Sequence, residues 1–174
     1  MTTIAATKKI ARLGILLGIT VALSALESLF ALPFLPPNMK PGFANVVVMY
    51  AAFALDAKSA ITLNALKAVF VFTIRGAMAG ALSFAGGMLS IIIILALLSV
   101  RRASFSYIFI SVSGAISHNL GQFLVISIWF NAPEFMYYTP FILASGVIFG
   151  VLTGSVLRAL MPLLEKIAKP EKKV

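Results

Sequence analysis

The chain has no cysteine, one histidine and five acidic residues among its 174 residues. Without cysteine it can form no disulfide, thiol nucleophile or thiolate metal site. Asp56 is the sole aspartate, and no GxxxxGK[ST] segment is present. A carboxylate-rich magnesium site and ATP hydrolysis by a phosphate-binding loop are therefore both excluded. We expect no metal, no cofactor and no catalytic residues.

Charge is also scarce: 11% of the residues are charged and 61% are hydrophobic. Soluble domains have about 25% charged and about 45–50% apolar residues. The composition predicts an all-α integral membrane protein, a bundle of six transmembrane helices in a single domain over residues 1–174. A span needs about 20 apolar residues. We place the spans at about 10–31, 44–56, 58–78, 84–100, 104–130 and 139–163, with a first outer loop at 33–45.

The net charge of +9 arises from basic residues near the ends of these spans. Such residues favour the cytoplasmic side of a membrane. We therefore predict a plasma-membrane protein with both termini cytoplasmic, contact with anionic lipid and no nucleic-acid partner. The basic positions on the expected inner side are Lys8, Lys9, Arg12, Lys58, Arg101, Arg102, Arg158, Lys166, Lys169, Lys172 and Lys173.

The fifth span carries polar side chains at its centre. His118 and Gln122 lie four residues apart and share one face of a helix, and Asn119 is adjacent to His118. Polar groups in hydrocarbon are costly and generally face a bundle interior or a wet cavity. This span is predicted to form one wall of a binding site. The alternative is that the three side chains only hydrogen-bond to neighbouring helices.

The third span carries two basic residues on one helical stripe, Lys67 near its middle and Arg75 near its outer end. A lysine inside a membrane indicates a functional site and needs a partner. Glu27 in the first span is the acid within reach, so a structural pair of Glu27 with Lys67 or Arg75 is one alternative. Another is that the Lys67 stem extends toward the membrane surface.

The first outer loop, PFLPPNMKPGFAN, contains four prolines and cannot be a regular helix. Its apolar character predicts that it folds over the bundle as a lid, although it could instead be a stiff connector. With the polar residues of the spans it would enclose a net positive cavity for a small anionic or polar-headed organic ligand. The predicted ligand-binding residues are Asn38, Lys40, Asn45, Lys67, Arg75, His118, Asn119 and Gln122.

Two spans carry small residues at intervals of four. Such ladders let helix backbones approach closely in a membrane. We assign them to docking of a separate membrane subunit, with packing inside the bundle as the alternative. The ladder residues are Gly14, Gly18 and Ala22 in the first span, and Gly146, Gly150 and Gly154 in the sixth.

Three segments carry a family resemblance: PGFAN at 41–45, TIRG at 73–76 and SGAISHNLGQ at 113–122. They resemble the membrane family of heptaprenyl diphosphate synthase component I, also called Gx transporters. That family is related to the substrate-binding S components of energy-coupling factor (ECF) transporters. The resemblance, over about residues 8–163, implies capture of a small molecule from outside, with an ECF transmembrane subunit and a pair of ATPases as partners. The first-span ladder departs from the alanine pair typical of S components.

The family label also implies a prenyl diphosphate synthase. Such synthases hold magnesium and diphosphate through aspartate-rich motifs, which a chain with one aspartate cannot provide. We therefore expect a protein that is not an enzyme. Two other functions stay open: a non-catalytic accessory or anchor for polyprenyl diphosphate or quinone synthesis or a redox complex, and a stand-alone transporter or channel. The latter is less favoured because no internal repeat is evident.

Overall fold

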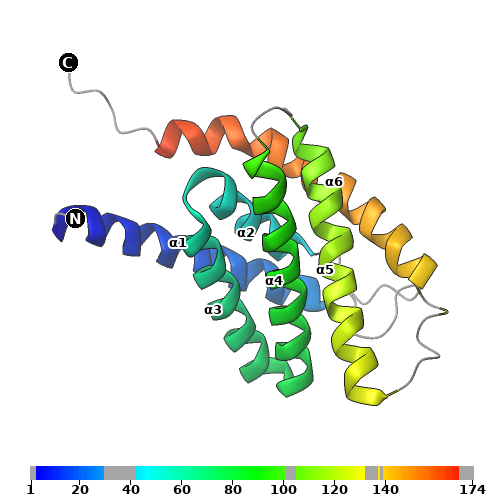
Figure 1. Cartoon of the computed structure of the whole chain (residues 1–174). Helices are drawn as coiled ribbons and strands as arrows, with labels where there is room; N and C mark the ends of the chain where they lie inside the picture. Colours follow the sequence, from blue (N-terminus) through cyan, green and yellow to red (C-terminus); the bar gives the residue numbers. More distant parts are fainter. Residues whose placement is uncertain (1–2, 30–41, 101–104, 132–136, 138, 169–174) are drawn as a thin grey trace.

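A computed structural model describes residues 3–29, 42–100, 105–131, 137 and 139–168 of the chain. In these residues the secondary structure is six α-helices (Figure 1). The all-α class is therefore confirmed, and five of the helices are long and apolar enough to cross a membrane. The helices are α1 (Thr3–Leu29), α2 (Phe43–Ala54), α3 (Ala57–Arg75), α4 (Ala77–Ser99), α5 (Tyr107–Phe130) and α6 (Thr139–Ala168).

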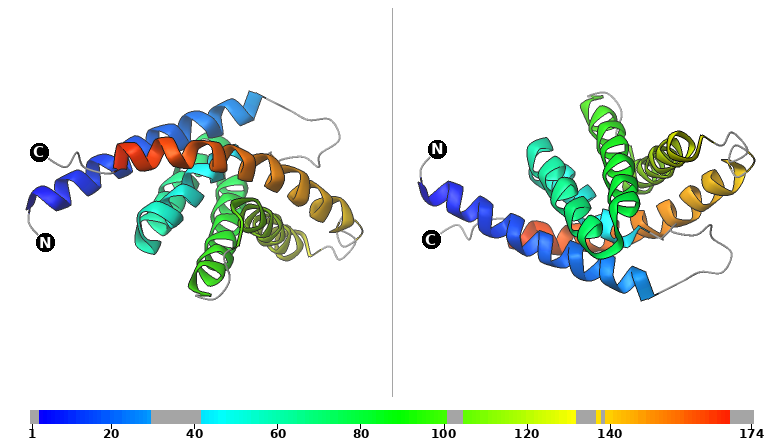
Figure 2. Two further views of the ribbon diagram at one scale, coloured as in Figure 1. Left: turned by 90° about the horizontal axis from the view of Figure 1, so that it is seen from above. Right: turned by 90° about the horizontal axis from the view of Figure 1, so that it is seen from below.

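Helices α3 to α6 form a row in which consecutive helices pack against each other. Two views along the bundle show α1 and α6 crossing one side, with α3, α4 and α5 on the other (Figure 2). The N-terminal end of α1 and the C-terminal end of α6 lie toward the same side of the molecule (Figure 1). Helix α2 contacts α1, α3, α4 and α6, and therefore occupies the centre of the bundle.

The core is built around α2, whose residues are buried on nearly every side from Ala44 to Ala52. A helix that is apolar all round can lie in a core or in lipid. With 12 residues, α2 is about 18 Å long, well short of the roughly 30 Å hydrocarbon core. The expected short second span is thus a central core helix. Its residues share one buried hydrophobic cluster with Leu63, Ile91, Ile94 and Leu157 of the neighbouring helices.

Several helix boundaries differ from the sequence-based spans: α1 begins at Thr3 rather than at about 10, α6 ends at Ala168 rather than at about 163, and α4 and α2 begin at unexpected positions. Helix α4 begins at Ala77, well before the expected start at 84, because the single residue Gly76, with φ 87°, reverses the chain between α3 and α4. Positive φ is readily adopted by glycine. Helix α2 begins at Phe43, so the last residues of the expected outer loop are helical. Residues 33–41 of that loop, with Asn38 and Lys40, lie outside the described residues.

The sixth-span ladder lies inside the protein. A Cβ atom added to Gly150 would lie 2.6 Å from Val112 Cα, and one added to Gly154 would lie 2.9 Å from Ile108 Cα. Gly146 meets Ile116 in the same way, at 3.1 Å. These glycines let α5 and α6 approach closely. These glycines pack inside the bundle, so the assignment of Gly146, Gly150 and Gly154 to partner docking is corrected to internal packing.

The first-span ladder has the opposite environment. A Cβ atom added to Gly14 or Gly18 would meet no atom within 4 Å, and both glycines are exposed, as is Ala22. Close packing inside the described part of the bundle therefore does not explain this ladder.

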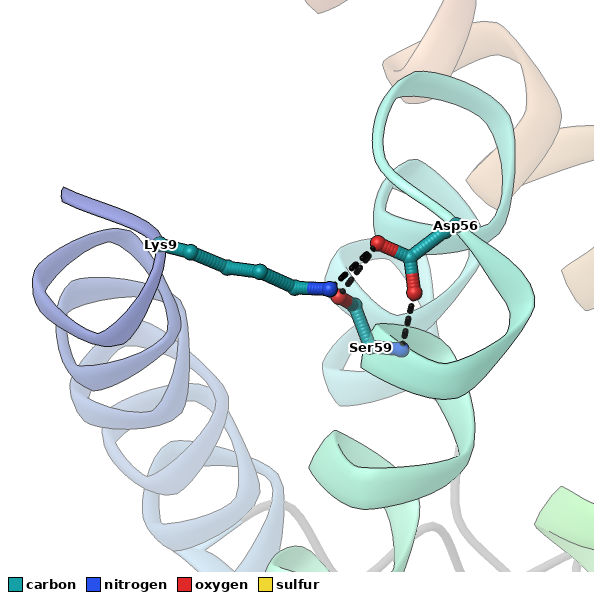
Figure 3. A network of polar contacts seen from close by, with 3 residues as sticks. All are labelled: Lys9, Asp56 and Ser59. Carbon is teal, nitrogen blue, oxygen red and sulfur yellow. Dashed lines mark hydrogen bonds and ion pairs between the residues drawn. The ribbon is translucent and has the colours of Figure 1, made fainter. Parts of the chain in front are cut away.

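Helix α3 begins at an N-cap that also joins it to α1. Asp56 Oδ1 accepts a hydrogen bond of 2.8 Å from Ser59 N, and Asp56 Oδ2 lies 2.8 Å from Lys9 Nζ (Figure 3). The Lys9 ammonium and the Ser59 hydrogen bonds lower the pKa of the Asp56 carboxyl from 3.8 to about 2. The sole aspartate of the chain is thus a helix cap.

We predict that Gly150→Leu destabilises the protein, because the new side chain must push α5 and α6 apart. Overpacking of this kind costs about 1–3 kcal/mol. Gly14→Leu is the matched control, since it makes the same change in helix propensity at an unobstructed position. Thermal unfolding in detergent micelles should show a lower midpoint for the first variant only. Equal midpoints would contradict the packing of this ladder.

We also predict a specific pH dependence at Asp56. Its folded-state pKa lies below the unfolded value, so its contribution to stability is present above about pH 4 and is lost as pH falls toward 2. Asp56→Ala should lower the free energy of unfolding by about 1 kcal/mol at neutral pH, the usual cost of losing an N-cap. Asp56→Asn, which keeps an acceptor, should cost less. The differences from wild type should shrink in melts recorded between pH 4 and 2.

Candidate functional site

A cavity of about 50 Å³ lies where the C-terminal ends of α1 and α3 meet the N-terminal ends of α2 and α4 and the second half of α5. This volume exceeds the roughly 10–15 Å³ needed for one water molecule, so the cavity can be wet. The lining residues are Ser24, Glu27, Gly42, Ala44, Asn45, Lys67, Val71, Arg75, Ala79, Leu82, Ser83, His118 and Gln122.

Lys67 is the buried cation of the cavity, with 4% of its surface exposed. Its Nζ donates a hydrogen bond of 2.6 Å to Asn45 Oδ1, from the first turn of α2. The ammonium therefore stays within the bundle, and the alternative that it extends to the membrane surface is wrong. Val71 and Arg75, further along the predicted stripe of α3, line the same cavity.

Asn64 lies on α3 three residues before Lys67 and has a different role. Its Nδ2 donates to Phe84 O at 3.2 Å, which ties α3 to α4. The side chain fills the space beside Gly87, where any Cβ would collide with it. This residue packs the two helices together and does not line the cavity.

Glu27, 6% exposed, places a carboxylate at the N-terminus of α2. Its Oε1 accepts a hydrogen bond of 3.0 Å from Ala44 N. Glu27 and Lys67 line the same cavity, and the carboxylate charge attracts the Lys67 ammonium. Glu27 and Lys67 thus hold consecutive residues of α2, Ala44 and Asn45.

Helix α5 contributes His118 and Gln122 to the cavity wall, as their spacing of four predicts. His118 packs on Gly86 of α4, where an added Cβ would lie 2.9 Å from the imidazole Cε1. The His118 Nδ1 atom is buried and has no hydrogen-bond partner in the described structure. It is a polar atom beside the cavity that a bound molecule could satisfy.

Asn119 faces a different direction from its two companions. Its Nδ2 donates to Ile142 O at 3.0 Å and to Ser145 Oγ at 3.2 Å, both on α6. It also lines a smaller cavity of about 20 Å³ that shares Gly42, Asn45 and His118 with the first. Asn119 thus makes the hydrogen bonds to a neighbouring helix that the alternative interpretation predicts.

The structure therefore gathers five of the predicted ligand-binding residues around one cavity: Asn45, Lys67, Arg75, His118 and Gln122. Asn119 lies beside it, and Asn38 and Lys40 lie outside the described residues. Sequence analysis did not single out Ser24 and Ser83. Ser24 stands three residues before Glu27, a spacing that places both on one helical face, so a signal for it was present.

Comparison with known proteins gives two matches. Residues 16–160 match the family described as heptaprenyl diphosphate synthase component I. A solved structure, described as the S component of a bacterial ECF transporter, superposes with a TM-score of 0.72. It is 18% identical in sequence, and the match covers 95% of this chain and 99% of that one. A search of curated proteins finds no significant match.

The structural match confirms the expected resemblance of the fold to S components. At 18% sequence identity it is evidence for the fold alone. The family match runs from α1 into α6 and so includes all of the residues that line the cavity. The chain belongs to the family of heptaprenyl diphosphate synthase component I.

Proposed function

We propose that this protein is a substrate-binding membrane subunit that captures a small anionic or polar-headed organic molecule for uptake. The observation that carries the proposal is the polar cavity around buried Lys67, inside a fold that matches a transporter S component. Buried charge in a membrane bundle is expensive and marks substrate or ion sites. The cavity is small, so the bound molecule places its polar head there.

The proposed orientation puts the cavity in the outer half of the membrane. The basic residues Lys8, Lys9, Arg12 and Lys58 lie at the opposite ends of α1 and α3, and such residues favour the cytoplasmic side. Both termini are then cytoplasmic, and the ligand enters from outside.

Uptake requires an energised partner, because the chain has no nucleotide-binding motif. We propose an ECF transmembrane subunit with its ATPase pair. The docking face is α1, where Gly14, Gly18 and Ala22 are exposed and leave room for the backbone of another helix.

The family name supports a second candidate, a non-catalytic accessory of prenyl diphosphate or quinone synthesis. Asp56 contacts Lys9 and Ser59 rather than lying in an acidic cluster, which argues against direct magnesium catalysis. Purification of the native complex separates the two candidates. An ECF transmembrane subunit and ATPases support the first, and a soluble synthase supports the second.

We predict that Gln122→Ala and Arg75→Ala each weaken retention of the small molecule that co-purifies with the protein. Truncating a buried polar contact to a charged group costs about 2–5 kcal/mol, or roughly 30-fold or more in affinity. Native mass spectrometry of the purified protein measures the retained molecule. Leu124→Ala, at an exposed position of α5, is the control and should retain it fully. Undiminished retention by both cavity variants would reject the site.

We predict that Gly18→Leu weakens co-purification with the ECF transmembrane subunit, because the side chain blocks close approach of the partner helix. The isolated variant should fold normally, since nothing in the described structure obstructs this position. Ile19→Phe adds bulk on a different stripe of the exposed surface and serves as the control. Aggregation of the glycine variant, or unchanged co-purification, would rule out this docking face.

A further inference from the structure

The first turn of α2 presents a donor that is buried inside the helix bundle. The first N–H groups of any helix lack partners within the helix. Gly42, at the N-cap, supplies no side-chain cap, and Ala44 is only 3% exposed. The Glu27 carboxylate accepts from Ala44 N and so satisfies this donor from another helix. Negative charge is favourable at this end of a helix.

A buried cation lies beside the same turn. Lys67 Nζ has three donor positions, and in the described structure Asn45 Oδ1 is the acceptor that it contacts. Its charge is also attracted by Glu27. One carboxylate thus serves two needs, the Ala44 N–H and the Lys67 charge. Another acidic group in the cavity could accept the Ala44 N–H and balance the Lys67 charge in place of Glu27.

A third group makes the position suited to a bound molecule. His118 lines the cavity with Glu27 and Lys67, and its buried Nδ1 has no partner in the part of the chain that the structure describes. Buried polar atoms are nearly always hydrogen-bonded. The internal carboxylate therefore satisfies the helix and the lysine but leaves the imidazole unsatisfied.

We propose that Glu27 is an exchangeable internal anion, and that the ligand's acidic head, a single carboxylate or phosphate group, displaces it from Ala44 N–H and Lys67. This inference rests on the proposed function and names the class of its substrate. A head group that carries a hydroxyl, such as hydrogen phosphate, can also donate a hydrogen bond to the buried His118 Nδ1. The displaced carboxylate stays in the cavity, where Ser24 supplies a hydroxyl. Glu27 thereby keeps the cation balanced while the site is empty.

Head-group probes test the exchange directly. Acetate and inorganic phosphate are small enough for a cavity of this size, and acetamide is the neutral counterpart of acetate. Each is titrated against the purified protein in micelles, and the thermal midpoint is followed, because binding to the folded state raises it. The variant is Glu27→Gln, which keeps an acceptor for Ala44 N but removes the charge. Asp56→Asn removes one negative charge outside the cavity and is the matched control.

Glu27→Gln should respond to acetate or phosphate at about tenfold lower concentration than wild type. Such a gain follows if the position is open in about one wild-type molecule in ten. Asp56→Asn should respond like wild type, and acetamide should not distinguish the variants. Without added anion both single variants should unfold at a lower temperature than wild type, because Lys67→Met leaves the buried Glu27 charge unbalanced and Glu27→Gln leaves the buried Lys67 charge unbalanced. The double variant Glu27→Gln, Lys67→Met should recover folding and show no response to either anion.

A Glu27→Gln variant that responds to anions no better than wild type, or a double variant that still responds, would overturn the exchange. Failure of every probe on wild type and Glu27→Gln would overturn it too. These outcomes leave the proposed function standing if a molecule is retained and an ECF module co-purifies. An anion response without a retained molecule or a module would instead reject the transport role while supporting the exchange.

Discussion

Hydrocarbon offers no partner to a polar group, and this constraint governs the centre of the molecule. Helix α2 is too short to carry its ends to the membrane surfaces, so its first N–H groups need acceptors inside the protein. Glu27 supplies one of them, and its negative charge is matched by Lys67. The charged cavity is thus a consequence of placing a 12-residue helix in the core.

Sequence periodicity predicted the polar wall well where one helical face carries all the relevant groups. His118 and Gln122 share a face four residues apart, and both line the cavity. The α3 stripe likewise brings Lys67 and Arg75 together. Periodicity could not say which neighbour a face meets. Asn119, adjacent to His118, turns to α6, and Asn64 turns to α4, because each direction depends on how the helices are arranged.

The two glycine ladders illustrate the same limit. Gly14 and Gly18 on α1, and Gly150 and Gly154 on α6, have equal spacing in sequence and opposite surroundings in the structure. The spacing indicates a face suited to close approach but does not identify the helix that approaches. The early start of α4 was missed for a local reason. One glycine can reverse the chain, so the glycine- and alanine-rich segment after it does not have to be a loop.

The length of α1 has a consequence for how the membrane itself acts on the cavity. Its 27 residues extend about 40 Å, more than the roughly 30 Å hydrocarbon core, so α1 either tilts in the bilayer or carries its first turns, with Lys8 and Lys9, beyond the hydrocarbon. Its substantial contacts are with α2 and α3, whereas α4 and α5 touch backbone to backbone at Gly86 and Gly121. A change in the tilt of α1 would move Glu27 relative to Lys67, which lies on α3. Bilayer thickness would in that case act on the spacing of two charges that line the cavity.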